Sequence, residues 1–115
     1  MKTQVFTSKE ECVEHYLKLQ GKRIDFTEDE VRDFLNTNVS TNGTVGKKAE
    51  EIAGLPTYAV IRRVVTWSTC PEVYAEVHFP EFIEAKGVSS IYILTFKEQE
   101  DGTYKCEVPD FKILY

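Results

Sequence analysis

The second half of the chain contains four runs with the composition or alternation of β-strands, and this pattern limits the possible folds more than any other feature. The first run, Thr57 to Trp67, is rich in β-branched residues, and the second, Glu72 to Phe79, has an apolar residue at every second position. The last two, Val88 to Glu98 and Thr103 to Tyr115, flank Asp101-Gly102, a pair that suits a tight hairpin turn. We therefore predict four antiparallel strands in two hairpins.

The first half of the chain carries signals for helices. Ser8 to Glu11 and Thr27 to Glu30 each fit a capping box, in which side chains and backbone at a helix start bond each other reciprocally. A third, short helix is expected over residues 45–53. Residues 1–56 are therefore predicted to be a helical half that covers one face of the sheet formed by residues 57–115. The expected fold is a single α+β domain with N-terminal helices packed on a four-stranded antiparallel sheet.

The first hairpin predicts which side chains share a face of the sheet. If residues 68–71 form a four-residue loop, the pairs are Trp67 with Glu72, Val65 with Tyr74, Arg63 with Glu76, and Ile61 with His78. One face then carries a mostly aromatic set around an ion pair. Its members are Ile61, Val65, Trp67, Tyr74 and His78, with Arg63 and Glu76 as the ion pair. This face is too aromatic to contact only water, so we expect a second copy of the chain or a protein partner to cover it.

Arg62 and Arg63 are adjacent, and adjacent residues of a strand point to opposite faces of its sheet. One of the two should therefore point toward the helices, where an unpaired charge is costly. We expect a carboxylate such as Asp25, Asp29 or Asp33, or an anionic ligand, to neutralise it.

The composition narrows the classes of partner and cofactor. Fourteen basic residues against nineteen acidic ones give a net charge of −5, so a basic face for nucleic acid is not expected. No apolar run reaches the roughly 18–20 residues of a membrane span, and the start lacks the apolar region of a signal peptide, so we expect a cytoplasmic protein. The three cysteines and two histidines have no metal-ligand spacing. No metal or other cofactor is expected.

The last hairpin and the order of elements resemble a known superfamily. An apolar strand, an Asp-Gly turn and an aromatic-plus-lysine restart follow one another in Ile91-Tyr92-Ile93-Leu94-Thr95-Phe96-Lys97, Asp101-Gly102-Thr103-Tyr104-Lys105 and Asp110-Phe111-Lys112-Ile113. With helices before the strands, this pattern resembles the nuclear transport factor two-like (cystatin-like) superfamily. The resemblance implies a cone-like fold, in which a curved sheet wraps a long helix around a pocket, and dimerisation through the outer face of the sheet.

Our leading hypothesis is a non-catalytic interaction protein that binds a protein partner through the outer face of the sheet. Tryptophan, tyrosine and arginine dominate interface hot spots, and the candidate binding residues are Arg63, Trp67, Tyr74, Glu76 and His78. A toxin-neutralising immunity protein, or an inhibitor of bacterial or phage origin, fits the small size and the acidity of the chain.

The resemblance also leaves an alternative open. The superfamily includes ketosteroid isomerase-like enzymes and small-molecule carriers, and a pocket between the sheet and the first helix is expected to be lined by Tyr16, Arg62 and Tyr92. Those enzymes tend to carry an acidic residue and an aromatic after the second helix, where residues 36–46 contain neither. We therefore favour the non-catalytic hypothesis.

Overall fold

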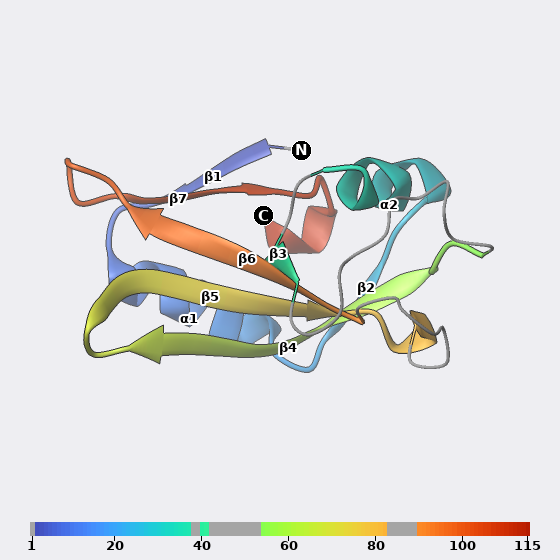
Figure 1. Ribbon diagram of the computed structural model, residues 1–115, viewed down its shortest axis with the longest axis horizontal. Coiled ribbons are helices and arrows are strands. Elements are labelled where there is room, and N and C mark those ends of the chain that lie inside the picture. The colour runs from blue at the N-terminus through green and yellow to red at the C-terminus, as the bar shows by residue number, and fades with distance from the viewer. Residues whose placement is uncertain (1, 38–39, 42–53, 83–89) are drawn as a thin grey trace.

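A computed structural model describes residues 2–37, 40–41, 54–82 and 90–115 (Figure 1). Strands and helices alternate in the first part of the chain, and strands predominate in the second. The strands are β1 (Lys2–Phe6), β2 (Arg23–Asp25), β3 (Ser40–Thr41), β4 (Tyr58–Trp67), β5 (Cys70–His78), β6 (Ile91–Glu98) and β7 (Tyr104–Val108). The helices are α1 (Lys9–Leu19) and α2 (Glu28–Leu35), with single 3-10 turns η2 (Pro80–Phe82) and η3 (Lys112–Leu114). The helix predicted over residues 45–53 lies outside the described residues.

Six strands form one antiparallel sheet in the order β1-β7-β6-β5-β4-β2, and β3 pairs with β6 beside this path. The sheet curls into a half-barrel, with α1 behind β4 and β5 and α2 at the end that carries β2 (Figure 1). We call the face that α1 covers the inner face and the opposite one the outer face. The predicted α+β class is confirmed. The prediction of four strands is wrong, because two strands from the predicted helical half join the two ends of the sheet.

The end strands β1 and β2 are short, which explains why their sequence pattern did not reveal them. In β1, Gln4 and Phe6 are buried between exposed neighbours, a strand period that extends over only five residues. Its partner is β7, where Val108 lies opposite Lys2. The three residues of β2 pair with the start of β4. Segments this short form strands only because a neighbouring strand supplies the hydrogen bonds.

Both predicted helix starts are present, and one capping box is complete. At α2, Thr27 accepts from the amide of Glu30 at 3.2 Å, and the Glu30 carboxylate accepts from the amide of Thr27 at 2.8 Å. At α1, Ser8 accepts from the amide of Glu11 at 3.1 Å, but the Glu11 carboxylate accepts from the hydroxyl and the amide of Thr7 instead of Ser8. These bonds lower the pKa of Glu11 and hold α1 close to the end of β1.

The hairpin turn predicted at Asp101-Gly102 is present between β6 and β7, in a loop of residues 99–103. Gly102 adopts a φ of +84°, the left-handed region that glycine tolerates. Gln99 and Thr103 close the loop, because the amide of Gln99 donates to the carbonyl of Thr103 at 2.7 Å. The Asp101 carboxylate accepts from the amide of Thr103 at 3.0 Å. This part of the sequence prediction is confirmed.

The core fills the space between the inner face and the helices with two groups of aromatic rings. One group surrounds Phe79, whose ring lies 5.4–5.9 Å from four others. Those neighbours are Phe26, Phe34, Phe82 and Tyr92. The second group joins β1, α1 and β6 through Phe6, Tyr16 and Phe96. Because these rings fill the inner face, the side chains that a partner could reach lie on the outer face and at the margins of the sheet.

Candidate functional site

A hollow of about 240 Å³ lies on the outer face, across β4, β5 and β6. We call it the outer hollow, and its lining residues are Arg63, Val65, Trp67, Tyr74, Glu76 and Ile93. Four of the five residues predicted to bind a partner therefore lie around one concave site. The fifth, His78, lies further along β5, opposite Val60 of β4 and Ile91 of β6.

The β4–β5 register was predicted correctly in its centre and wrongly at both ends. Val65 lies opposite Tyr74 and Arg63 opposite Glu76, as expected. Beyond this centre, Ile61 pairs with Val77 and Trp67 pairs with Cys70. The loop therefore contains two residues, 68 and 69, instead of four. At the other end, a β-bulge inserts Arg62 as an extra residue, which shifts the alternation by one. Ile61 is consequently buried in the core instead of lying on the outer face.

The same bulge determines where the two arginines lie. Both Arg62 and Arg63 contact Glu76 on the outer face, through Nη1 to Oε1 at 3.4 Å and through Nε to Oε2 respectively. The prediction that one of them points toward the helices is therefore wrong. The Glu76 side chain is only 4% exposed, whereas the arginine side chains are 47% and 55% exposed. One buried carboxylate thus balances two half-exposed guanidinium groups, and this cluster carries one excess positive charge.

Tyr74 and Trp67 form the aromatic part of the outer hollow. The Tyr74 hydroxyl donates to the Glu72 carboxylate and lies 3.6 Å from the sulfur of Cys70. The bond to Glu72 raises the pKa of Tyr74, so the phenol remains protonated at neutral pH. Trp67, by contrast, is 57% exposed. The outer hollow therefore combines a tyrosine fixed by a hydrogen bond with an exposed tryptophan.

His78 does not add charge to this face at neutral pH. Partial burial lowers the pKa of His78 below its ordinary value, and the nearby charge of Arg62 lowers it further. The imidazole is therefore mostly neutral at pH 7. His78 does not line the outer hollow, and its mostly neutral imidazole adds no charge to a binding surface there.

The three residues of the alternative interior pocket do not lie around one space. Arg62 is on the outer face, whereas Tyr16 and Tyr92 are buried in different aromatic groups of the core. The Tyr16 hydroxyl donates to the side-chain carbonyl of Gln4, whose amide donates to the backbone carbonyl of Leu114 at 2.7 Å. Burial strongly raises the pKa of Tyr16. This tyrosine therefore links α1, β1 and the C-terminal turn as a neutral donor.

We expect Tyr16→Phe to lower the free energy of unfolding by about 1–2 kcal/mol, because it leaves the buried carbonyl of Gln4 without this donor. Urea denaturation of the variant measures the effect. Tyr74→Phe is the matched control, since its hydroxyl is at the half-buried rim of the outer hollow, and its loss should cost less. Equal effects of the two variants would contradict the structural role of the Tyr16 hydroxyl.

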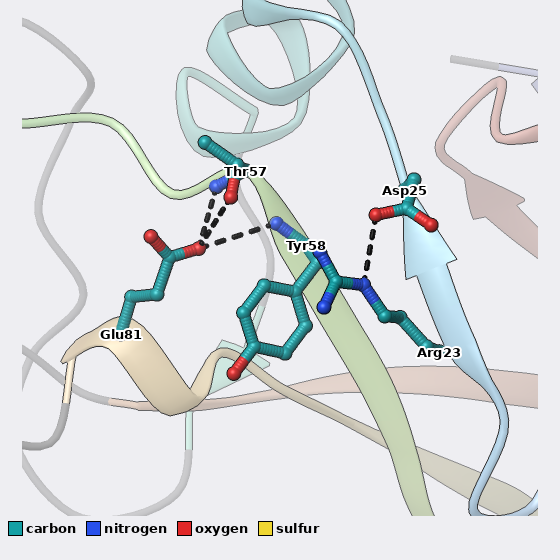
Figure 2. A network of polar contacts seen from close by, with 5 residues as sticks. All are labelled: Arg23, Asp25, Thr57, Tyr58 and Glu81. Carbon is teal, nitrogen blue, oxygen red and sulfur yellow. Dashed lines mark hydrogen bonds and ion pairs between the residues drawn. The ribbon is translucent and has the colours of Figure 1, made fainter.

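A second hollow of about 440 Å³ lies where β2, the start of α2 and η3 meet, a site that the sequence did not suggest. Two of its charged groups, Arg23 and Asp25, bind each other. Arg23 pairs with Asp25 at 2.8 Å and stacks over the ring of Tyr58 at 4.0 Å, as Figure 2 shows. Next to them, one oxygen of Glu81 accepts from the amide of Thr57 at 2.7 Å and from that of Tyr58 at 3.3 Å (Figure 2).

These contacts have a structural role around the second hollow. Glu81 fixes η2 to the start of β4, and its bonds to Thr57 lower the pKa of Glu81. Arg23 and Asp25 are two residues apart in β2, a spacing that places both on one face of a strand and could have suggested their pairing. Because Arg23, Asp25 and Glu30 are engaged in local contacts, we regard the outer hollow as the better candidate site.

Comparison with protein-family models, with curated proteins and with solved structures gave no match for this chain. Among the residues that the structure describes, no three histidine, cysteine, aspartate or glutamate side chains gather as metal ligands. No described helix is both long and apolar enough to span a bilayer.

Proposed function

We propose that the chain is a non-catalytic interaction protein that binds a protein partner through the outer hollow. The observation that carries this proposal is the position of Trp67, which is 57% exposed beside a hollow with a buried carboxylate in its lining. A large exposed ring next to a concave site is typical of an interface anchor, and tryptophan, tyrosine and arginine are the residues most enriched at hot spots.

The geometry also supports a rigid binding surface. The lining side chains project from three adjacent strands, and the Glu76 carboxylate holds both arginines in place. Side chains held on regular elements lose little freedom when they bind, so less of the binding free energy is spent on ordering them.

The partner that fits this surface has a mixed chemistry. Trp67, Val65 and Ile93 offer apolar surface, whereas Arg62 and Arg63 together exceed the charge of Glu76 by one. We therefore propose that the partner inserts an apolar side chain into the outer hollow and places a carboxylate against the exposed part of the arginine pair.

Within this class, we propose a toxin-neutralising immunity protein or an inhibitor of bacterial or phage origin. The short chain and its net charge of −5 support that choice. Membership of the nuclear transport factor two-like superfamily stays a prediction, supported by the curled antiparallel sheet with α1 packed on it. The alternative enzyme or carrier lacks comparable support, because Tyr16, Arg62 and Tyr92 lie apart.

Trp67→Ala should abolish capture of the partner, whereas Leu17→Ala should leave it intact. Leu17 is the matched control because it is also an exposed apolar residue, at 51%, but belongs to α1. Tagged wild-type and variant proteins are used to capture proteins from a lysate of the source cell, and mass spectrometry quantifies what each retains. We expect at least a tenfold loss with Trp67→Ala, as for a hot-spot residue.

Two results would overturn this proposal. One is a retained protein that is equally abundant with Trp67→Ala and with wild type. The other is a loss of the same protein with Leu17→Ala, which would place the interface on α1. Circular dichroism of both variants ensures that a loss of binding does not reflect unfolding.

A further inference from the structure

Among the described residues, no strand pairs with the outer margin of β4 along its second half. One edge of β4 pairs with β5 over most of its length. The other edge pairs with β2 at residues 58–60 and contacts Gln20 and Gly21 at Ile61. From Arg62 to Trp67, no described strand pairs with this edge, and β4 forms the lower margin of the sheet in Figure 1.

The hydrogen bonds around the bulge show which backbone groups face outward. The carbonyl of Ile61 accepts from the amide of Gly21 at 2.9 Å, so Ile61 faces away from β5. Arg62 and Arg63 together oppose Glu76, and the bulge therefore shifts the alternation by one residue. After the bulge, the backbone groups of Val64 and Thr66 face outward, whereas those of Val65 face β5.

We propose that a second copy of this chain adds antiparallel along this edge, around a twofold axis at Val65. In this register, Val64 of one copy lies opposite Thr66 of the other, and the two Val65 residues face each other across the axis. Each Val64–Thr66 pair can exchange two backbone hydrogen bonds, because both residues face outward. The dimer contact lies along the edge of β4 and shares Arg63, Val65 and Trp67 with the outer hollow, but the proposal does not depend on the proposed function.

The side chains are complementary in the same register. Arg63 lies opposite Trp67 of the second copy on the outer face, an arrangement that favours a cation–π contact. No like charges lie opposite one another between Arg63 and Trp67. A shift by one residue would oppose side chains of different faces. An axis at Val64 would leave only one outward-facing pair, so the axis at Val65 is the register that the edge favours.

The closed symmetry distinguishes this dimer from other strand additions. The other end of the sheet, β1, also has one edge that no described strand pairs with. Pairing of β4 with β1 of the next copy would repeat without closing and would give growing assemblies. Two β4 edges around an axis give a dimer only, and they join the outer faces of both copies into one surface.

A charge pair at the axis tests both the dimer and its register. Light scattering at increasing concentration should show wild-type mass rising from 13.2 kDa toward twice that value. Val65→Lys and Val65→Asp should each remain at 13.2 kDa, because like charges then meet across the axis. An equimolar mixture of these two variants should regain the dimer. Val5→Lys on β1 is the matched control and should dimerise like wild type.

Each contrary result overturns the proposal. A wild-type chain that stays monomeric up to its solubility limit excludes the dimer. A dimer that persists in Val65→Lys, or is lost in Val5→Lys, belongs to another surface. Failure of the Lys and Asp variants to recombine excludes the axis at Val65, and mass that grows beyond the dimer indicates open assembly. Circular dichroism verifies that the variants fold. Because these measurements use the purified chain alone, failure of the dimer proposal would not decide whether the outer hollow binds a different protein.

Discussion

Phe79→Ala should lower the free energy of unfolding by about 3–5 kcal/mol, the usual cost of removing a buried aromatic ring. Phe79 is fully buried and contacts four other rings, which come from β6, α2, η2 and the segment between β2 and α2. Its removal leaves a cavity that the surrounding strands and helices can fill only in part. Urea denaturation followed by circular dichroism measures the change.

Trp67→Ala is the matched aromatic control for this prediction. Trp67 is 57% exposed, so its removal should change the unfolding free energy by less than about 1 kcal/mol. If Phe79→Ala proves too unstable to purify, Phe79→Leu retains part of the ring volume and should show a smaller loss of the same sign. Similar losses for Phe79→Ala and Trp67→Ala would contradict the assignment of inner and outer faces. The contrast also matters for binding, because Trp67→Ala is expected to affect the partner without affecting the fold.

Glu76→Gln should lower the free energy of unfolding by about 1–3 kcal/mol. The substitution preserves the shape of the side chain but leaves Arg62 and Arg63 without their shared counter-charge. Breaking a fully buried ion pair costs more, but here the arginines are half exposed and water compensates in part. Chemical denaturation of the purified variant measures the loss.

Glu28→Gln is the matched control, because Glu28 forms an exposed ion pair with Arg32 at 2.7 Å and its loss should cost about 0.5 kcal/mol or less. A double-mutant cycle then tests the shared role of Glu76 directly. Arg63→Ala should cost less in the Glu76→Gln background than in wild type, since the ion pair is already absent. Additive effects would show that Glu76 and Arg63 do not stabilise each other.

Local sequence was sufficient for the elements whose signals lie within a few residues. The capping signals at Ser8 and Thr27 start helices because the interacting groups are three residues apart. The Asp101-Gly102 turn likewise forms because Gly102 accepts a left-handed backbone. The central β4–β5 pairs follow from the alternation of side chains along a strand, so the sequence alone predicts that Arg63, Tyr74 and Glu76 share one face.

The β-bulge at Arg62 could not be predicted from the local sequence. Either arginine can occupy an outward or inward position in a regular strand, and their sequence does not distinguish a bulge from regular alternation. The buried Glu76 carboxylate of the neighbouring strand lies opposite both of them. A single extra residue then places Ile61 in the core and both guanidinium groups outside.

By itself, therefore, the sequence determined the α+β class, the positions of α1 and α2, the main strands and most of the candidate binding residues. Only the tertiary structure decided that β1 and β2 complete the sheet, that Ile93 joins the outer hollow, and that β2 pairs with only the first three residues of β4. These features depend on pairing between distant segments, such as Lys2 with Val108. Such pairing is governed by the fit of the whole sheet and core, which short-range patterns do not contain.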